Sequence, residues 1–157
     1  MLPVLALALA LHPAHATEVG NGKDFGIGVA LGVGAAFTGK WWFGPHNGFA
    51  FHVGSGYGNW VGGQVQWEGD IVQFVDWPFA NFNMYWDAGI TSYMWTWSHN
   101  EGLTVGGTGG IGVDLRFHKV PAAVFLETDA HVMPIALGDA EPVWFDVYGV
   151  TGGRWYF

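Results

Sequence analysis

The sequence predicts an all-β fold, an eight-stranded antiparallel up-and-down β-barrel that spans a membrane with its strands. Three observations predict it: an excess of glycine and aromatic residues, eight segments that alternate with period two, and a polar face that is too poor in charge to be a solvated exterior. The 157 residues include 26 Gly, 10 Trp and 12 Phe, and only 11% are charged, against roughly 25% in a soluble domain. Glycines spread along the chain disfavour helices, at roughly 1 kcal/mol each.

The composition excludes several classes of function. The chain has no Cys, which excludes a disulfide scaffold and any thiolate site. Its 13 acidic and 5 basic residues give a net charge of −8, and without a basic patch we expect no binding of nucleic acid. No two histidines beyond residue 16 have the spacing of metal ligands on a strand, so we expect no metal and no cofactor.

The N-terminus reads as a targeting segment. Residues 2–11 form an apolar run that is too short to cross a bilayer as a helix. Ala14, His15 and Ala16 follow it as a small-x-small cleavage site. We therefore expect a signal peptide at residues 1–16 and a barrel domain at residues 17–157. No Lys or Arg precedes the run, so either the α-amino group supplies the positive charge or the true start lies upstream, and a buried N-terminal helix is the alternative.

Eight alternating segments bounded by turn signals follow. Residues 44–48 and 118–121 are predicted tight turns, and the longer connection 69–81 falls at the same end of the barrel. Residues 32–36, 55–59, 91–104 and 133–143 connect strands at the other end. The predicted strands are residues 25–31, 37–43, 49–54, 60–68, 82–90, 105–117, 123–132 and 144–157.

The two faces of these strands differ in an unusual way. In the sixth strand Ile111 and Val113 share one face, while Asp114 and Arg116 share the other with glycines. A soluble barrel fills its interior with large aliphatic side chains, but here the polar face carries mostly glycine and isolated ions of both signs. We therefore predict that the polar face lines a narrow lumen and that the apolar face, rich in Trp and Phe near the strand ends, contacts lipid. A soluble lipocalin- or avidin-like barrel is the alternative.

Several motifs resemble those of bacterial outer-membrane barrels. The chain ends in an Arg-Trp-Tyr-Phe run in which Trp155 and Phe157 resemble the assembly signal of these proteins. The runs at residues 25–29, 37–42, 110–116 and 124–127 are similar, in order and spacing, to a group of small, largely uncharacterised outer-membrane barrel proteins. The chain departs from that group at residues 71–78, which are unusually apolar for a periplasmic turn.

This resemblance implies an eight-stranded barrel like the membrane domain of OmpA or like OmpX. It places the chain in the outer membrane of a Gram-negative envelope, with both termini periplasmic. Its implied partners are outer-membrane lipid, lipopolysaccharide and the barrel assembly machinery, and a protein partner is unknown. It implies no established activity, because such scaffolds carry diverse roles.

The candidate site is a network of charges in the lumen. Ions are tolerated in such a narrow interior when they are paired, so we expect a salt-bridge network that plugs the barrel, with Lys40 or Arg116 considered as the partner of Glu127. A selectivity filter or a proton path is the alternative. The predicted network consists of Lys40, Glu68, Asp87, Asp114, Arg116, Glu127, Asp146 and Arg154, and Asp129 is expected to face the lumen with them.

The predicted loop at residues 91–104 holds two further candidates. Tyr93, Trp95 and Trp97 form a possible interaction surface, or else a continued strand with the outer aromatic girdle. Ser98, His99 and Glu101 are adjacent on a loop, and a catalytic triad needs groups that converge from separate places, so no catalytic residue is expected. We therefore expect a structural role or a loop-mediated interaction or adhesion role. The alternatives are a barrel enzyme that acts on lipids, such as a lipid A deacylase-like protein, and a soluble periplasmic ligand-binding barrel.

Overall fold

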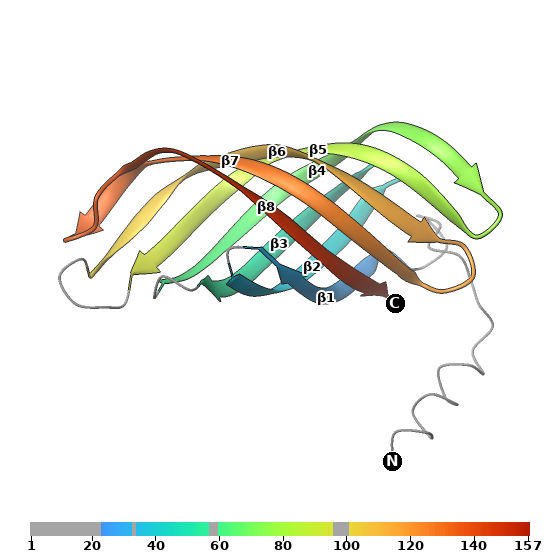
Figure 1. Ribbon diagram of the computed structural model, residues 1–157, viewed down its shortest axis with the longest axis horizontal. Coiled ribbons are helices and arrows are strands. Elements are labelled where there is room, and N and C mark those ends of the chain that lie inside the picture. Colours follow the sequence, from blue (N-terminus) through green and yellow to red (C-terminus); the bar gives the residue numbers. More distant parts are fainter. Residues whose placement is uncertain (1–22, 33, 57–59, 96–100) are drawn as a thin grey trace, which may run out of the picture.

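The computed structural model describes residues 23–32, 34–56, 60–95 and 101–157. Their eight antiparallel strands close into one barrel in chain order (Figure 1), which confirms the predicted all-β barrel. The expected signal peptide, residues 1–16, lies outside the described residues. The described part of the chain holds no helix long and apolar enough to cross a membrane. The strands are β1 (Phe25–Leu31), β2 (Gly34–Gly44), β3 (Asn47–Gly56), β4 (Trp60–Trp77), β5 (Ala80–Trp95), β6 (Gly102–Phe117), β7 (Ala122–Gly138) and β8 (Val143–Tyr156).

The barrel is closed by the first and last strands. Gly26 of β1 pairs with Lys40 of β2 on one side and with Tyr156 of β8 on the other. The backbone N–H of Phe157 donates to the carbonyl of Phe25 over 2.8 Å. The start of β1 and the end of the chain therefore lie together, at the barrel end that also carries the β2–β3, β4–β5 and β6–β7 turns.

The long connection predicted at residues 69–81 is wrong. Strand β4 continues to Trp77 and turns into β5 after only two residues. Its register with β5 shifts after Asp70 and again after Gln73. A bulge inserts one unpaired residue and interrupts the alternation of side chains, so this stretch lacks the period-two pattern of a strand although it is one.

Strand β7 is also longer than predicted, because it passes through a bulge. The predicted strand ends at Val132, whereas β7 continues through Pro134 to Gly138. The register with β6 shifts between Val105 and Gly107. Proline cannot donate a ladder hydrogen bond and is tolerated in strands at bulges, which explains how the strand continues past it.

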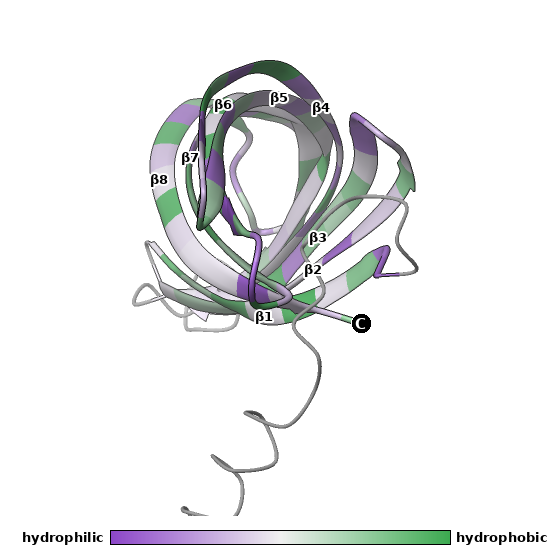
Figure 2. Ribbon diagram, turned by 90° about the vertical axis from the view of Figure 1, so that its right-hand side faces the viewer, coloured by the Kyte–Doolittle hydropathy of each residue, from purple (hydrophilic) through white to green (hydrophobic). Residues whose placement is uncertain are grey.

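Side-chain burial follows the predicted faces. Lys40, Glu68 and Glu127 point into the barrel and are at most 1% exposed, while Val29 and Ile90 on the outer surface are 67% and 66% exposed. Figure 2 shows hydrophilic and hydrophobic residues alternating along the strands. Lys and Glu are almost never fully buried unless they are paired, so the interior must hold their partners.

A row of aromatic side chains crosses the outer surface near the end of the barrel that carries the C-terminus. Its members come from four consecutive strands, β2 to β5, and are all exposed. Neighbouring rings in the row lie 4.9 to 6.5 Å apart, a spacing typical of favourable aromatic pairs. The row consists of Trp41, Phe43, Phe49, Trp67 and Trp86.

At the same end, β4 of the β4–β5 hairpin extends past β3 (green, Figure 1), while β6 pairs with β5 as far as Ala80. Strand β3 pairs with β4 only as far as Gly69. From Ile71 to Trp77 every residue of β4 is exposed, on both faces of the strand. The residues that read as an unusually apolar turn are therefore an apolar extension of the barrel wall.

Candidate functional site

The candidate site is the lumen, where polar side chains from seven of the eight strands are buried. They form three neighbouring groups, which differ in how their charges are matched. Two of the groups contain a Lys or Arg, and the third contains only acids.

The first group is built around Glu68 of β4. Lys40 of β2 forms an ion pair with one carboxylate oxygen of Glu68, and Arg154 of β8 approaches the other, with its Nη1 3.5 Å away. All three side chains are at most 4% exposed. Two cations therefore share one buried anion, an arrangement that keeps each charge partnered inside the barrel.

Neutral groups complete the surroundings of these cations. Arg154 donates from Nε to the Thr38 hydroxyl over 3.0 Å, and its Nη2 lies 3.3 Å from Nε2 of His52. The Lys40 ammonium lies 3.7 Å from the centre of the Trp42 ring. Phe125 takes the same position against Arg154, with the guanidinium 4.1 Å from its ring centre. Such cation–π contacts are strongest where water is excluded.

The second group is built around Arg116 of β6. Its guanidinium donates two hydrogen bonds to the two oxygens of Asp70, over 2.9 and 2.6 Å. Its Nε donates to Asp114 over 2.9 Å, and Asn83 donates to the other oxygen of Asp114 over 3.0 Å. The fork of Arg116 thus binds Asp70 of β4 in the bidentate geometry that makes Arg–carboxylate pairs strong.

The third group, which we call the carboxylate cluster, consists of Asp87 of β5 and Glu127 and Asp129 of β7. Each of the three is at most 3% exposed. No Lys or Arg forms an ion pair with any of them in the described part of the chain. Each accepts one hydrogen bond from a neutral side chain: Gln66 donates to Asp87 over 2.9 Å, Tyr85 to Glu127 over 2.8 Å, and Gln64 to Asp129 over 3.1 Å.

The expectation that Lys40 or Arg116 is the partner of Glu127 is wrong. Glu127 accepts from the Tyr85 hydroxyl, and its other oxygen lies 3.7 Å from Nε2 of His52. Gly112 makes the Tyr85 contact possible, because a Cβ at that position would lie 2.2 Å from the ring carbon Cζ of Tyr85. The ring fills the space that the missing side chain leaves.

Asp146 does not belong to the buried network. It lies on β8 opposite His131 of β7, toward the end of the barrel away from the C-terminus, and is exposed. One of its oxygens accepts from the backbone N–H of Val147 over 2.9 Å. The period-two pattern assigned it to the lumen face correctly, but the lumen is open to solvent at this level.

The predicted loop surface is largely part of the barrel. Tyr93 is 7% exposed and points inward, with its hydroxyl 3.3 Å from Nδ1 of His131, so its assignment to an exposed interaction surface is wrong. Trp95 ends β5 and is half-buried. Trp97 lies outside the described residues, as do Ser98 and His99.

At the C-terminus, the two residues of the predicted assembly signal lie side by side with β1. Trp155 pairs with Ile27 of β1 and with Ala122 of β7. Phe157 is 59% exposed. Between them Tyr156 points inward and is buried, as alternation requires.

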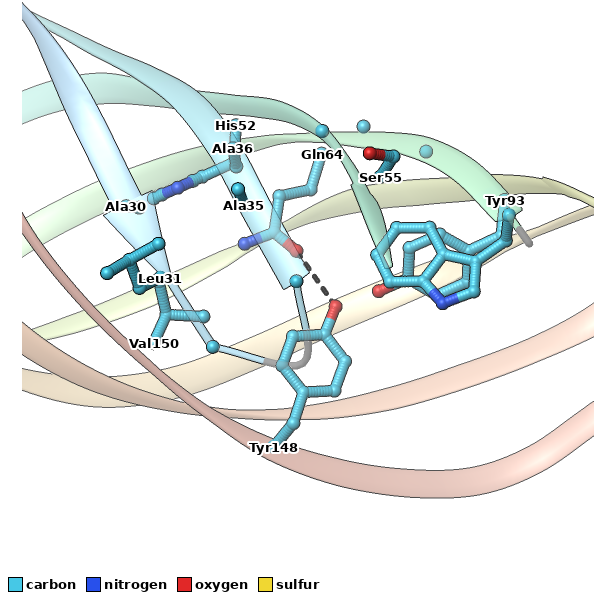
Figure 3. Close-up of a pocket in the computed structure, with 16 residues that line it drawn as sticks. Ala30, Leu31, Ala35, Ala36, His52, Ser55, Gln64, Tyr93, Tyr148 and Val150 are labelled. Atoms are coloured by element: carbon cyan, nitrogen blue, oxygen red, sulfur yellow. Dashed lines mark hydrogen bonds between the residues drawn. The ribbon is translucent and has the colours of Figure 1, made fainter. Parts of the chain in front are cut away.

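A cavity of about 60 Å³ opens above these groups, toward the barrel end opposite the C-terminus (Figure 3). Its wall on β1 to β3 is made of small residues such as Ala30 and Ala36. Tyr93 and Tyr148 face them, and the lining also includes His52 and Gln64, which contact Arg154 and Asp129 of the charged groups. The Tyr148 hydroxyl donates to the side-chain oxygen of Gln64 over 3.4 Å.

The predicted network omits several side chains that hold this site together, among them Asp70, Gln64, Gln66 and Tyr85. Asp70 lies two residues from Glu68, on the same strand face, and alternation would have found it if the strand had been extended. Gln64 and Gln66 lie on that face as well, but neutral amides carry no charge signal. Nothing in the sequence distinguishes Tyr85 from the other tyrosines, because its role depends on Gly112 in the neighbouring strand.

The comparisons with known proteins address the fold. No protein-family model matches the sequence, and no curated protein matches it. Among solved structures, the chain is similar to the N-terminal β-barrel domain of OprF from Pseudomonas aeruginosa, with a TM-score of 0.53 and 8% sequence identity over 85% of this chain and 95% of that one. At this identity the likeness shows the fold alone, and it supports the OmpA-like eight-stranded barrel that the resemblance implies.

Proposed function

We propose that this protein is an outer-membrane β-barrel of a Gram-negative envelope, with a lumen that its own side chains close and a structural role rather than a catalytic one. The fold likeness to the OprF barrel domain supports this class. The proposal places the turns β2–β3, β4–β5 and β6–β7 in the periplasm and the opposite end outside the cell.

The observation that carries the proposal is the inverted burial of the barrel. Buried ions line the inside, whereas large apolar side chains such as Val29, Val65 and Leu126 cover the outside and are more than half exposed. Soluble proteins rarely expose contiguous apolar patches larger than a few hundred Å². A continuous apolar exterior is the expected surface of a transmembrane barrel.

Two further features support a membrane location. The aromatic row from Trp41 to Trp86 lies where the girdle of a transmembrane barrel lies, near one end of the apolar band. The shortest strands, β1 to β3, have 7, 11 and 10 residues, close to the 9–11 that a tilted strand needs to cross a bilayer. Because the barrel is closed, no strand edge is left unpaired over the length that all eight strands have in common.

The interior argues against a soluble ligand-binding barrel. Such a barrel encloses an apolar cavity, whereas the middle of this lumen is occupied by the ion pairs of Glu68 and Arg116. An eight-stranded barrel encloses an interior just wide enough for side chains. We therefore propose a plugged lumen that does not pass solutes.

The test is folding with and without detergent. Purified unfolded protein should fold in detergent micelles and then migrate faster on a gel when unboiled than when boiled, because the closed barrel resists the denaturing detergent of the gel. In plain buffer it should remain unfolded or aggregate. A folded, soluble state in plain buffer would contradict the membrane location.

A further inference from the structure

The carboxylate cluster is brought together by a glycine. Asp87 of β5 and Asp129 of β7 both pair with Gly110 of the intervening strand β6. A Cβ at Gly110 would lie 2.4 Å from Oδ1 of Asp129 and 3.0 Å from Oδ2 of Asp87. The two side chains therefore approach each other across β6 through the space that a side chain would fill. Glu127 joins them, and the three residues each offer an oxygen within 4.8 Å of the others.

Each member of the cluster has one oxygen held and one oxygen free. The held oxygens accept from Gln66, Tyr85 and Gln64, as described above. The free oxygens are Oδ2 of Asp87, Oε1 of Glu127 and Oδ1 of Asp129; all three are buried and have no hydrogen-bond partner. A buried carboxylate oxygen without a partner is costly, so three of them in one place would be stabilised by a bound cation.

The barrel's own cations do not neutralise the cluster. Lys40 and Arg154 are engaged by Glu68, and Arg116 is engaged by Asp70 and Asp114. Among the described residues, the basic side chain within ion-pair distance of the cluster is His52, whose Nε2 lies 3.7 Å from the free oxygen of Glu127 and 3.3 Å from the Arg154 guanidinium. Beside a cation, His52 is a poor source of compensating charge.

The cavity lies beside the cluster: none of the three acids lines it, but two of its lining side chains contact them. Gln64 and His52 are among its lining residues, and these two side chains contact Asp129 and Glu127. A volume of about 60 Å³ accommodates several water molecules, at roughly 10–15 Å³ each on the same measure. The cavity can therefore hold water beside the side chains that contact the cluster.

We propose that Asp87, Glu127 and Asp129 bind a hard divalent cation, of the calcium type, inside the barrel. Oxygen is the ligand that Ca²⁺ selects, at about 2.3–2.6 Å, so three oxygens that all lie within 4.8 Å of one another can reach a single ion between them. Gln64, Gln66 and Tyr85 would orient the ligands by holding their outer oxygens, as second partners of metal ligands do. The site depends on the lumen alone and not on a membrane location.

The test uses the full chain, folded in detergent from lipid-free material and stripped with EDTA. Calorimetric titration with Ca²⁺ should show one saturable site with a Kd below about 1 mM. Terbium should bind the same site, with luminescence excited through Tyr85 and quenched by added Ca²⁺. Replacing both aspartates, Asp87→Asn with Asp129→Asn, should weaken Ca²⁺ binding at least tenfold. The matched control, Asp139→Asn with Glu141→Gln, removes two exposed acids and should bind as the wild type does.

Three results would overturn the proposal. One is the absence of saturable Ca²⁺ binding by the wild type. Another is equal affinity in the cluster variant and the control variant. The third is a combination of two observations: the wild type melts at the same temperature in EDTA and in millimolar Ca²⁺, and the cluster variant is more stable than the wild type. Together they would show that protons, and not Ca²⁺, neutralise the cluster. If the double variant does not fold, Glu127→Gln in its place carries the same comparison.

Discussion

At the scale of single residues, the lumen is organised by large polar side chains packed against glycines. Tyr85 lies over Gly112 and donates to Glu127, so one position without a side chain fixes both the ring and a carboxylate. A side chain at Gly112 would displace the Tyr85 ring. Much of the glycine that makes this composition unusual is thus required by the width of the lumen.

We expect Gly112→Ala to reduce the free energy of unfolding by about 1–3 kcal/mol, because moving Tyr85 leaves a buried donor and acceptor without partners. Gly109→Ala is the matched control on the same strand, since its Cβ would meet its nearest neighbour, the Asp87 carbonyl oxygen, at an ordinary 3.4 Å. Urea unfolding in detergent, followed by tryptophan fluorescence, measures both. Equal losses in the two variants would show that Tyr85 adjusts freely.

The ion pairs lead to a second expectation. Glu68→Gln should cost about 3–5 kcal/mol, because it leaves the buried charges of Lys40 and Arg154 without an acidic partner. Glu127→Gln keeps an acceptor for the Tyr85 hydroxyl and relieves repulsion between neighbouring acids, so in EDTA it should cost less than about 1 kcal/mol. The same unfolding measurement compares them. A small loss for Glu68→Gln would mean that water enters the lumen and solvates the pair.

Alternation alone predicts which of these residues point inward, and it does so correctly for Lys40, Glu68 and Arg154. It cannot predict which of them meet. Lys40 and Glu68 lie 28 positions apart in sequence, and their contact depends on how far each strand is staggered along the barrel. The stagger is set by hydrogen-bond registers over the whole sheet, which no short stretch of sequence encodes.

At the scale of elements, bulges are what the pattern hides. Strand β4 has two bulges, and past Asp70 its residues no longer alternate between polar and apolar. The sequence pattern therefore predicts a turn where the structure has a strand. Strand β7 continues past Pro134 in the same way. Strand β1, which pairs with both neighbours without a register shift, is predicted with the bounds observed, Phe25–Leu31. Bulges change direction and twist at a barrel rim, so strand ends are where sequence-based bounds fail.

The last strand carries a prediction about assembly. Phe157 is exposed and contributes one backbone hydrogen bond to Phe25, so its deletion should hardly change the stability of the folded barrel. If Phe157 is part of the assembly signal, deletion should nevertheless lower the amount of protein in the outer membrane several-fold. Membrane fractionation measures this, and Phe157→Tyr is the control that keeps a terminal aromatic residue. Normal levels of the truncated protein would contradict the signal.

At the scale of the whole molecule, the three lumen groups determine what the barrel can pass. The ion pairs around Glu68 and Arg116 lie nearer the C-terminal end, and the cavity lies nearer the other end, so an ion or water could enter from one side without crossing. We expect liposomes that contain the folded protein to swell in a small sugar no faster than empty liposomes. A 16-stranded porin is the positive control, since such barrels enclose a channel. Swelling above the empty control would show an open path.

The same architecture makes the exterior the most informative place to test the membrane proposal. Val65 is 57% exposed and lies in the wall between Phe51 of β3 and Ile90 of β5. In a soluble protein, an exposed Val65→Arg would change stability by about 0.5 kcal/mol or less. In a bilayer, arginine on the lipid face costs about 2–4 kcal/mol near the midplane, because its charge leaves water for hydrocarbon. We therefore expect Val65→Arg to lower stability by that amount in lipid vesicles, while Val65→Leu leaves it within about 0.5 kcal/mol; equal stability of both variants would place Val65 in water.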